Sequence, residues 1–408
     1  GSDTTEIKRE AGSVIPDGAT YTPSGKTTLV GNGTNKFPNT PSSGDTYEEG
    51  DYIYTYDEGQ EYQREDENDD YGTIYKDCGT EWSVVVKDKT KTQYGEILSE
   101  IAGKPMTHMV ATFEECESLI ISPSIPNSVV SMEAAFACCI SLTTMPTIPN
   151  SVNNMLYAFF GCESLDSVSV IPNSVVNMEG IFTECYSLTI APIIPNSVTH
   201  MHRAFGDCVS LKTYVGNTDP DGDFSNYKLP NGITNMNGTF RSCKLTYPPV
   251  IPQNVTDMHK TFEGCEFLIV SPNIPNGVTN MEDTFSNCTS LTTAPTIPNG
   301  VTDMSYTFRG CASLTTAPTI PSGVTNMYNT FYGCTSLITA PKIPSRVVIM
   351  DYTFENCTSL TGTITIDANP PHFNLCFKGT TKPIILTGTS TMLSELATTS
   401  TNGNVTVK

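Results

Sequence analysis

The chain has few of the features that enzymes, membrane spans and nucleic-acid-binding proteins depend on. Its 408 residues hold no apolar run near the roughly 20 residues that a membrane helix needs. Only five histidines occur, and the glycine-rich phosphate loop, G-x-S-x-G and H-E-x-x-H are all missing. Basic side chains are scarce, 22 against 43 acidic ones, and a net charge of −21 argues against binding to nucleic-acid phosphates. These deficits favour a protein that is not an enzyme, binds no nucleic acid and inserts into no membrane.

Cysteine is abundant instead, and its spacing is regular. Methionine recurs every 23 residues, apart from one step of 35 and one of 22; phenylalanine follows each methionine after four residues, and cysteine follows after three more. Eleven copies of this pattern predict a solenoid in which each repeat forms one coil and stacks on its neighbours. The repeat methionines, which number the coils one to eleven, are Met109, Met132, Met155, Met178, Met201, Met236, Met258, Met281, Met304, Met327 and Met350.

The residues of one repeat predict a strand, a turn and a short helical segment. In residues 291–298, Leu, Ala and Ile can point inward from an extended backbone while the threonines point outward. The Pro-Asn pair that follows favours a tight turn. Between Met304 and Cys311 the apolar residues are spaced by four and three, which predicts one or two helical turns. The expected fold class is therefore a repeat solenoid with short parallel strands and short helical turns in each coil.

The repeat L-x-x-A-P-x-I-P-x-x-V-x-x-M-x-x-x-F-x-x-C-x-x-L, between residues 106 and 360, resembles the leucine-rich repeats of BspA-like bacterial surface proteins. The resemblance implies a curved solenoid with a parallel sheet on its concave side. It also implies a secreted or cell-surface protein with an adhesin-like role in binding host proteins, matrix or other cells. Gly1-Ser2 looks like a cloning remnant, so an export signal is expected to be missing from the given sequence.

The composition changes on both sides of the repeats. Residues 1–44 are rich in Ser, Thr, Gly and Pro and are interpreted as an extended arm or linker. Residues 45–105 contain β-forming segments and end in 92–103, which begins with Thr and closes on Gly and so predicts a short helix. This segment is expected to be an acidic, β-rich N-terminal cap on the eleven-coil solenoid of 106–360. Residues 361–408 predict an α/β C-terminal cap, since a solenoid needs its terminal coils covered.

Two acidic segments could serve other purposes. Residues 45–70 hold 12 acids and one Arg, which favours a solvated face, with a site for a cation or a basic partner as the alternative. The 35-residue step contains an insertion, 215–230, for which a solvated loop, a ligand-contacting loop and a calcium site remain open. Lys228 stands where a calcium loop carries its bidentate Glu. Apart from calcium, no cofactor is expected, and the residues at calcium-loop positions are Asn217, Asp219, Asp221 and Asp223.

The repeat cysteines have four possible roles. Zinc needs four ligands that converge on one point, whereas one cysteine per coil forms a line. Disulfides between neighbouring coils would require the β-carbons to tilt toward each other. A nucleophile would need a basic neighbour and partial exposure. Free, buried thiols that pack as small apolar groups are therefore the favoured interpretation.

Binding is expected to depend on outward side chains that vary between coils. Exposed tyrosine and arginine are enriched where proteins bind one another, and rows of threonine could contact a protein strand or a glycan. The expected partner is a protein of a host or neighbouring cell; a carbohydrate-binding module and a structural spacer are the alternatives. No residue is assigned to catalysis. The candidate binding residues are Tyr306, Tyr328, Tyr332, Tyr352 and Arg309 on the predicted helical side, and Thr292, Thr296, Thr315 and Thr319 on the strand side.

Overall fold

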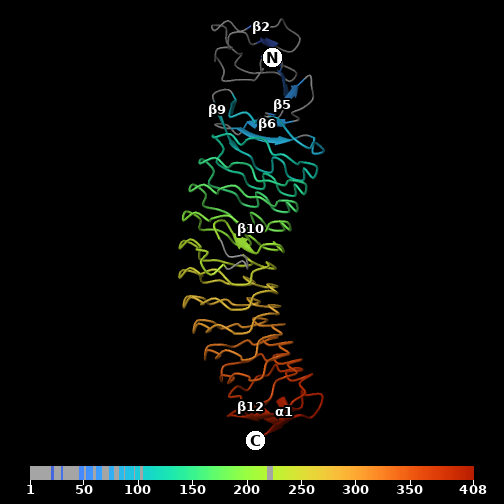
Figure 1. Cartoon of the computed structure of the whole chain (residues 1–408), viewed down its shortest axis with the longest axis vertical. Coiled ribbons are helices and arrows are strands. Elements are labelled where there is room, and N and C mark those ends of the chain that lie inside the picture. The colour runs from blue at the N-terminus through green and yellow to red at the C-terminus, as the bar shows by residue number, and fades with distance from the viewer. Residues whose placement is uncertain are drawn as a thin grey trace. The chain divides into compact units, whose positions relative to one another are not determined.

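The protein divides into two compact units, Gly1–Val175 and Val176–Lys408. In Figure 1 the strand labelled β9 belongs to the first unit, and β10 and β12 belong to the second. The computed structural model describes residues 104–217 and 224–408 without a break, and before them 82–86, 88–95, 97–101 and six earlier strands, β1 to β6. The calcium-loop residues Asp219, Asp221 and Asp223 lie outside the described residues. Each unit contains coils of the repeat, three in the first and eight in the second.

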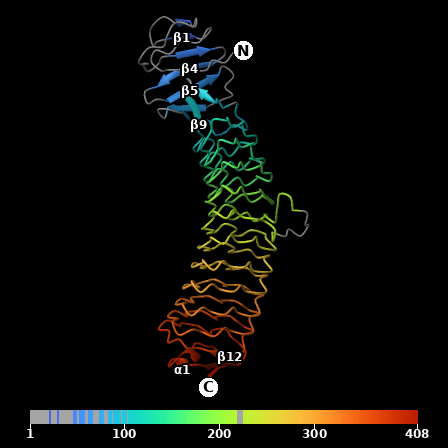
Figure 2. The same cartoon turned by 90° about the vertical axis from the view of Figure 1, so that its left-hand side faces the viewer.

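The first unit contains a nine-stranded sheet in the order β2-β1-β3-β4-β5-β6-β7-β9-β8. Its neighbours are antiparallel except for β7 and β9, which run parallel. Figure 2 shows β4 and β5 beside one another, as their pairing requires. The strands are β1 (Thr20–Thr22), β2 (Leu29–Val30), β3 (Thr46–Glu49), β4 (Tyr52–Asp57), β5 (Glu61–Asp66), β6 (Thr73–Asp77), β7 (Trp82–Val86), β8 (Glu100–Ile101) and β9 (Lys104–His108).

The predicted helix at 92–103 is wrong. Within 92–95 and 97–101 the chain forms no helix and ends in β8, which pairs antiparallel with β9. Tyr94 explains the extended path: its ring lies 5.0 Å from the ring of Phe113, and its hydroxyl donates to the Asp88 carbonyl. The segment therefore covers the first coil with a buried aromatic side chain, which local helix signals do not reveal.

Each coil buries the same side chains. Met304, Phe308 and Cys311 are fully buried, and the corresponding residues of the other coils are buried as well. The phenylalanine rings stack along both units. From Phe182 to Phe377 in the second unit, successive ring centroids lie 5.5 to 6.0 Å apart with planes within 20° of parallel. A coil cannot enclose this apolar layer alone, so its neighbours must cover it.

The segment from methionine to cysteine is not helical, which corrects the predicted helical turns. In coil nine, Tyr306 and Gly310 have φ of 55° and 70°, whereas a right-handed helix needs a φ near −63°. The amides of residues 307, 309 and 311 donate three residues back, while those of 304, 306, 308 and 310 donate to carbonyls of the next coil. The spacing by four and three therefore belongs to consecutive tight turns whose alternate amides bind the neighbouring coil.

The predicted strands and Pro-Asn turns are present, although the strands are very short. Thr316 pairs in parallel with Thr339 through a single bridge. Among the described coils, one parallel pair extends over two residues, β10 (Ile190–Ala191) with β11 (Thr213–Tyr214). The amide of Val301 donates to the Pro298 carbonyl at 3.1 Å and closes the turn. Proline inside the extended segment removes an amide donor, which limits the ladder to these short contacts.

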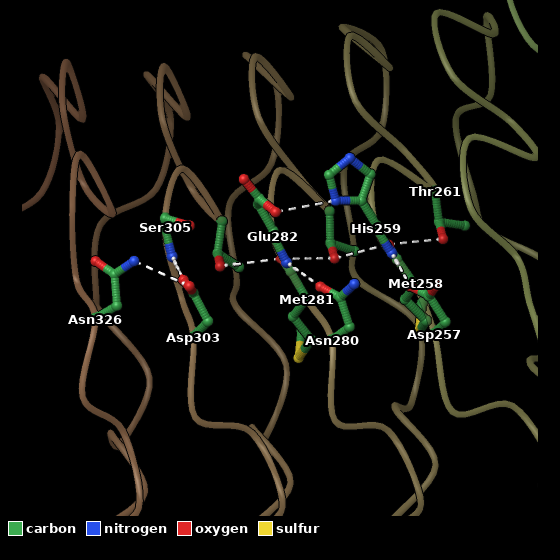
Figure 3. Close-up of polar contacts among 12 residues, drawn as sticks. Asp257, Met258, His259, Thr261, Asn280, Met281, Glu282, Asp303, Ser305 and Asn326 are labelled. Carbon is green, nitrogen blue, oxygen red and sulfur yellow. Dashed lines mark hydrogen bonds and ion pairs between the residues drawn. The ribbon is translucent and has the colours of Figure 1, made fainter.

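A second row of contacts precedes each methionine and was not predicted. Asp257, Asn280 and Asp303 accept a hydrogen bond through a side-chain oxygen from the amide two residues later, and their backbones form parallel bridges with one another (Figure 3). Beside them, the Thr284 hydroxyl donates to the Met258 carbonyl of the preceding coil at 2.9 Å. The Asp and Asn side chains satisfy amides that the tight turns leave without a backbone acceptor, whereas the threonine hydroxyl adds a second donor to a carbonyl that already accepts the Thr261 amide.

The cysteine thiols also bind the preceding coil. The Sγ of Cys334 donates to the Phe308 carbonyl oxygen at 3.1 Å, and burial raises the pKa of this thiol. All cysteines from Cys116 to Cys376 are free, which confirms the prediction of buried thiols for the repeat positions. The same bond, at 3.0 to 3.1 Å, is made by Cys139, Cys162, Cys208, Cys243, Cys265, Cys288, Cys311 and Cys357.

The stack of the second unit continues past residue 360. Phe373 stands at the next methionine position, and the ring of Phe377 stacks on Phe354 with centroids 5.5 Å apart. A three-stranded parallel sheet follows, in the order β12-β13-β14. Among the described residues no helix is long and apolar enough to cross a membrane. The elements here are β12 (Gly362–Thr365), β13 (Ile384–Thr387), α1 (Leu393–Ala397) and β14 (Val405–Val407).

The stacking predicts which cysteines react with iodoacetamide near pH 8. Cys138 is partly exposed and should alkylate in the folded protein, whereas Cys334 should alkylate only after denaturation, because burial raises its pKa and denies access. Peptide mass spectrometry, with and without urea, measures the extent of alkylation at Cys138 and at Cys334. Rapid alkylation of Cys334 in the folded protein would contradict the buried row.

Two glycines of the C-terminal sheet form a matched pair for stability. Gly388 and Gly362 have φ of 127° and 87°, but a Cβ at Gly388 would collide with the Ile366 backbone, while one at Gly362 would meet nothing within 4 Å. Gly362→Ala should cost about 1 kcal/mol from its φ alone. Gly388→Ala should cost at least about 2 kcal/mol more. Urea unfolding compares the two, and equal losses would contradict the close approach.

Candidate binding surface

Four tyrosines and one arginine meet on the turn side of coils nine to eleven. The rings of Tyr306 and Tyr328 have centroids 5.2 Å apart at 71°, and those of Tyr328 and Tyr352 lie 5.7 Å apart at 83°. The Arg309 guanidinium carbon lies 5.9 Å from the Tyr306 ring centroid and 5.7 Å from that of Tyr332. The structure thus brings all five of these candidate residues together; we call them the tyrosine surface.

The backbone turns place these side chains outward. Tyr306 and Tyr352 are the second residues after their methionines and have φ of 55° and 59°. Tyr328 is the first residue after Met327. All four tyrosines are partly buried and Arg309 is exposed. Edge-to-face contact between the rings holds each at a fixed angle, so the surface is ordered before any partner arrives.

A row of charge adjoins the rings. Arg309, Tyr332, Glu355 and Lys378 occupy the same position in four successive coils. The Lys378 ammonium lies 2.9 Å from the Glu355 carboxylate, which raises the pKa of Lys378. Arg309 has no carboxylate within 4.0 Å among the residues that the structure describes. Its guanidinium keeps donors available for an acceptor on another molecule.

The four candidate threonines are exposed, as predicted for the strand side. Thr292 donates its hydroxyl hydrogen to the Ile269 carbonyl of the preceding coil at 3.1 Å. That hydroxyl therefore contributes to the stacking of the coils, and only its acceptor capacity is left for a partner. Thr296, Thr315 and Thr319 extend the neutral face.

The insertion is anchored by aromatic side chains. Phe224 and Tyr227 are buried, and the Tyr227 hydroxyl donates to the Pro192 carbonyl at 2.6 Å. Of the four residues considered for calcium, only Asn217 is described; its amide donates to the Thr213 hydroxyl at 3.1 Å. No group of three or more His, Cys, Asp or Glu side chains suited to a metal ion occurs within the described part of the chain.

Histidines pair with acids in the row directly after the methionines. His259 Nδ1 lies 3.3 Å from the Glu282 carboxylate (Figure 3), and His202 Nδ1 lies 3.1 Å from that of Glu179. Each pair joins neighbouring coils and is partly exposed. These are surface ion pairs between coils, and such a pair usually contributes less than about 1 kcal/mol to stability.

Exposed apolar side chains are concentrated near the insertion, which was not predicted from the sequence. Eight large ones lie between residues 186 and 270, and none lies between 271 and 337. Two cavities occur here, one of about 340 Å³ lined by Tyr247, Pro248 and Val250, and one of about 410 Å³ lined by Val209, Lys244 and Phe267. In the sequence, these cavities are signalled by the two irregular spacings between repeat methionines, 35 and 22 residues instead of 23. The eight residues are Tyr186, Ile190, Ile193, Val209, Val215, Val250, Phe267 and Ile269.

Comparison with known proteins agrees with this architecture. The model of the BspA-type leucine-rich repeat region matches residues 110–219, 222–338 and 282–381. A leucine-rich repeat protein from Bacteroides ovatus has a similar fold, with a TM-score of 0.58 and 21% identity, over 88% of this chain and 98% of that one. A leucine-rich cell surface protein from Faecalibacterium prausnitzii is 21% identical over 81% of this chain and 96% of its own, with a TM-score of 0.39. No curated protein sequence matches the chain.

The tyrosine contacts predict a perturbed titration of Tyr306. Burial, then the hydrogen bond with the Tyr328 hydroxyl, raises the pKa of Tyr306 above its ordinary value near 10. The neutral phenol therefore favours the folded state; this contribution is complete below about pH 10 and is lost as the pH rises through the folded-state pKa. Difference absorbance titration of the protein against Tyr306→Phe isolates this phenol. In a Tyr328→Phe background the midpoint should fall, and an unchanged midpoint would contradict the contact.

Proposed function

Because the chain belongs to the BspA-type leucine-rich repeat family, we propose that it is a non-enzymatic, secreted or cell-surface binding protein that recognises a protein partner as an adhesin does. Repeats of this kind generally mediate protein binding, and a rigid stack presents side chains at fixed positions. The proposal needs no cofactor. The adhesin-like role and the extracellular location rest on the family resemblance.

The observation that carries the proposal is the tyrosine surface. Tyrosine and arginine are the side chains most often found at binding hot spots. The rings contact one another, and two of them contact Arg309. Ordered aromatic side chains lose little conformational freedom on binding, so more of the contact energy contributes to affinity.

The local charge suits a partner that supplies hydrogen-bond acceptors. Residues 286–408 hold five acidic and six basic side chains, so the acidic excess of the chain lies elsewhere. Arg309 can donate to a carbonyl or a carboxylate at this surface. Asp283 of the preceding coil, just outside this range, acts electrostatically on Tyr306, so a neutral polypeptide would meet less repulsion here than a strongly acidic one.

Two other functions remain as alternatives. A carbohydrate-binding module is favoured by the exposed neutral threonine rows, whose hydroxyls could contact sugars. A structural spacer that projects another domain would use neither surface. The two faces carry different residue types, so substitutions on each separate these possibilities.

The test measures binding of the full chain to a panel of purified extracellular-matrix proteins and to a glycan array. Changing Tyr306→Asn, Tyr328→Ser and Tyr332→Ser together should weaken protein binding by at least about tenfold, through loss of hot-spot contacts. Asn is chosen at 306 because it tolerates a positive φ. Biolayer interferometry gives the affinities, and thermal unfolding checks that the stack is intact.

The matched control changes Thr292→Ala and Thr315→Ala on the strand side. This variant should bind proteins as the unchanged chain does. Loss of binding in the threonine variant alone, with glycans as the ligands, would favour the carbohydrate module. Absence of binding to either panel would favour the spacer.

A further inference from the structure

One position of the repeat is broken in two neighbouring coils. The second residue after the repeat cysteine is serine in nine coils. In coil six it is deleted, since Cys243 is followed by Lys244 and then directly by Leu245, which accounts for the 22-residue step. In coil seven it is Phe267. The serines are Ser118, Ser141, Ser164, Ser187, Ser210, Ser290, Ser313, Ser336 and Ser359.

The deletion shortens the turn after Cys243, so coil six is recessed there between coils five and seven. In other coils the leucine amide closes a turn onto the cysteine carbonyl, as Leu268 does onto Cys265 at 3.1 Å, and this turn projects outward. Coil six lacks the residue that completes it. A notch of about 410 Å³ lies here, and Val209 of coil five and Phe267 of coil seven are among the residues that line it. This volume is within the range of sites that bind small molecules or side chains.

Stacking of the coils does not require a phenylalanine at position 267. The residue is 50% exposed, and serine occupies this position in nine coils. Val209 is 49% exposed, so two large apolar residues at the edge of the notch are in contact with water. Exposed apolar groups gathered in one place, rather than scattered singly, mark a surface that another molecule covers.

Polar groups surround the apolar walls. The Lys244 ammonium lies 5.1 Å from the Phe267 ring centroid, and no carboxylate lies within 4.0 Å of it among the described residues. Ser242, Glu266 and Asn287 also line the notch and offer donors and acceptors of the kind that a peptide backbone needs. A ring that entered beside Phe267 could pack edge-to-face against it and meet the ammonium with its own π face.

We propose that this notch is a second binding site, which takes an aromatic side chain of a partner polypeptide between Val209 and Phe267. It is separate from the tyrosine surface and does not depend on the adhesin proposal. The partner supplies one aromatic anchor, and its backbone meets the polar rim of the notch.

The test uses saturation-transfer NMR with the full chain and three probes: N-acetyl-tryptophanamide, N-acetyl-leucinamide and methyl glucoside. The tryptophan probe should receive saturation most strongly, and the leucine probe less. Phe267→Ser installs the residue found in nine other coils and should keep the fold. It should weaken the affinity for the tryptophan probe by about tenfold. Insertion of one serine between Lys244 and Leu245 restores the 23-residue step and should abolish binding by filling the notch.

Ser313→Phe is the matched control, because it places an exposed ring at the same position in an uninterrupted coil. This substitution, made in the Phe267→Ser background, should not restore binding. Equal binding of the tryptophan probe by the unchanged chain and by Phe267→Ser would overturn the proposal. So would restored binding in the control, which would show that an exposed ring suffices without the notch, or a preference for methyl glucoside.

Discussion

The coils are held at a fixed separation by backbone amides that donate to carbonyls of the next coil, and nine of the repeat cysteines add a hydrogen bond from the thiol to the phenylalanine carbonyl of the preceding coil. Cys311 Sγ reaches Phe285 O at 3.1 Å, and the rings of Phe285 and Phe308 then stack 5.7 Å apart. A thiol suits this position because it is small and apolar, yet still donates weakly to a carbonyl that already accepts a backbone amide. The abundance of cysteine is thus explained by packing. Redox chemistry would need exposure or a lowered pKa, and burial raises the pKa of these thiols.

Because the stack determines the inward residues, function is left to outward positions that the stack does not specify. The second residue after each methionine shows this most clearly, since its φ is positive whatever the residue type. Gly180, Gly238 and Asn329 occupy it without much strain, whereas Tyr306 and Tyr352 bear the cost of a left-handed backbone, about 1 kcal/mol each. Ala111, Arg203 and Lys260 have the same positive φ at this position, so the strain is a property of the repeat backbone. What distinguishes Tyr306 and Tyr352 is that their rings contact Tyr328 in the coil between them.

The sequence was sufficient for the repeat, the buried positions and the Pro-Asn turns, because stacking imposes the same residues on every coil. It was not sufficient for the backbone between Met304 and Cys311. A spacing of four and three is shared by a helix and by consecutive tight turns, and only the direction of the amides distinguishes them. The helix predicted at 92–103 failed for a different reason: Tyr94 is held by Phe113 and Asp88, which are contacts made after folding. Of the candidate site, the clustering of the tyrosines followed from the repeat period, but their edge-to-face angles did not.

Irregularity is informative in a protein of this kind, since each coil must match the next. An insertion or deletion disturbs two interfaces between coils and is tolerated only where the backbone can be closed again. Phe224 and Tyr227 close the insertion by filling the space beside Tyr214, so it has its own small core. Coil six has no such compensation: the missing residue leaves a notch, and the neighbouring Phe267 is larger than the serine of the other coils but does not fill it. Of these two adjacent departures one is compensated within the chain and the other is left open, and the open one has the apolar walls that the proposed aromatic side chain of a partner would cover.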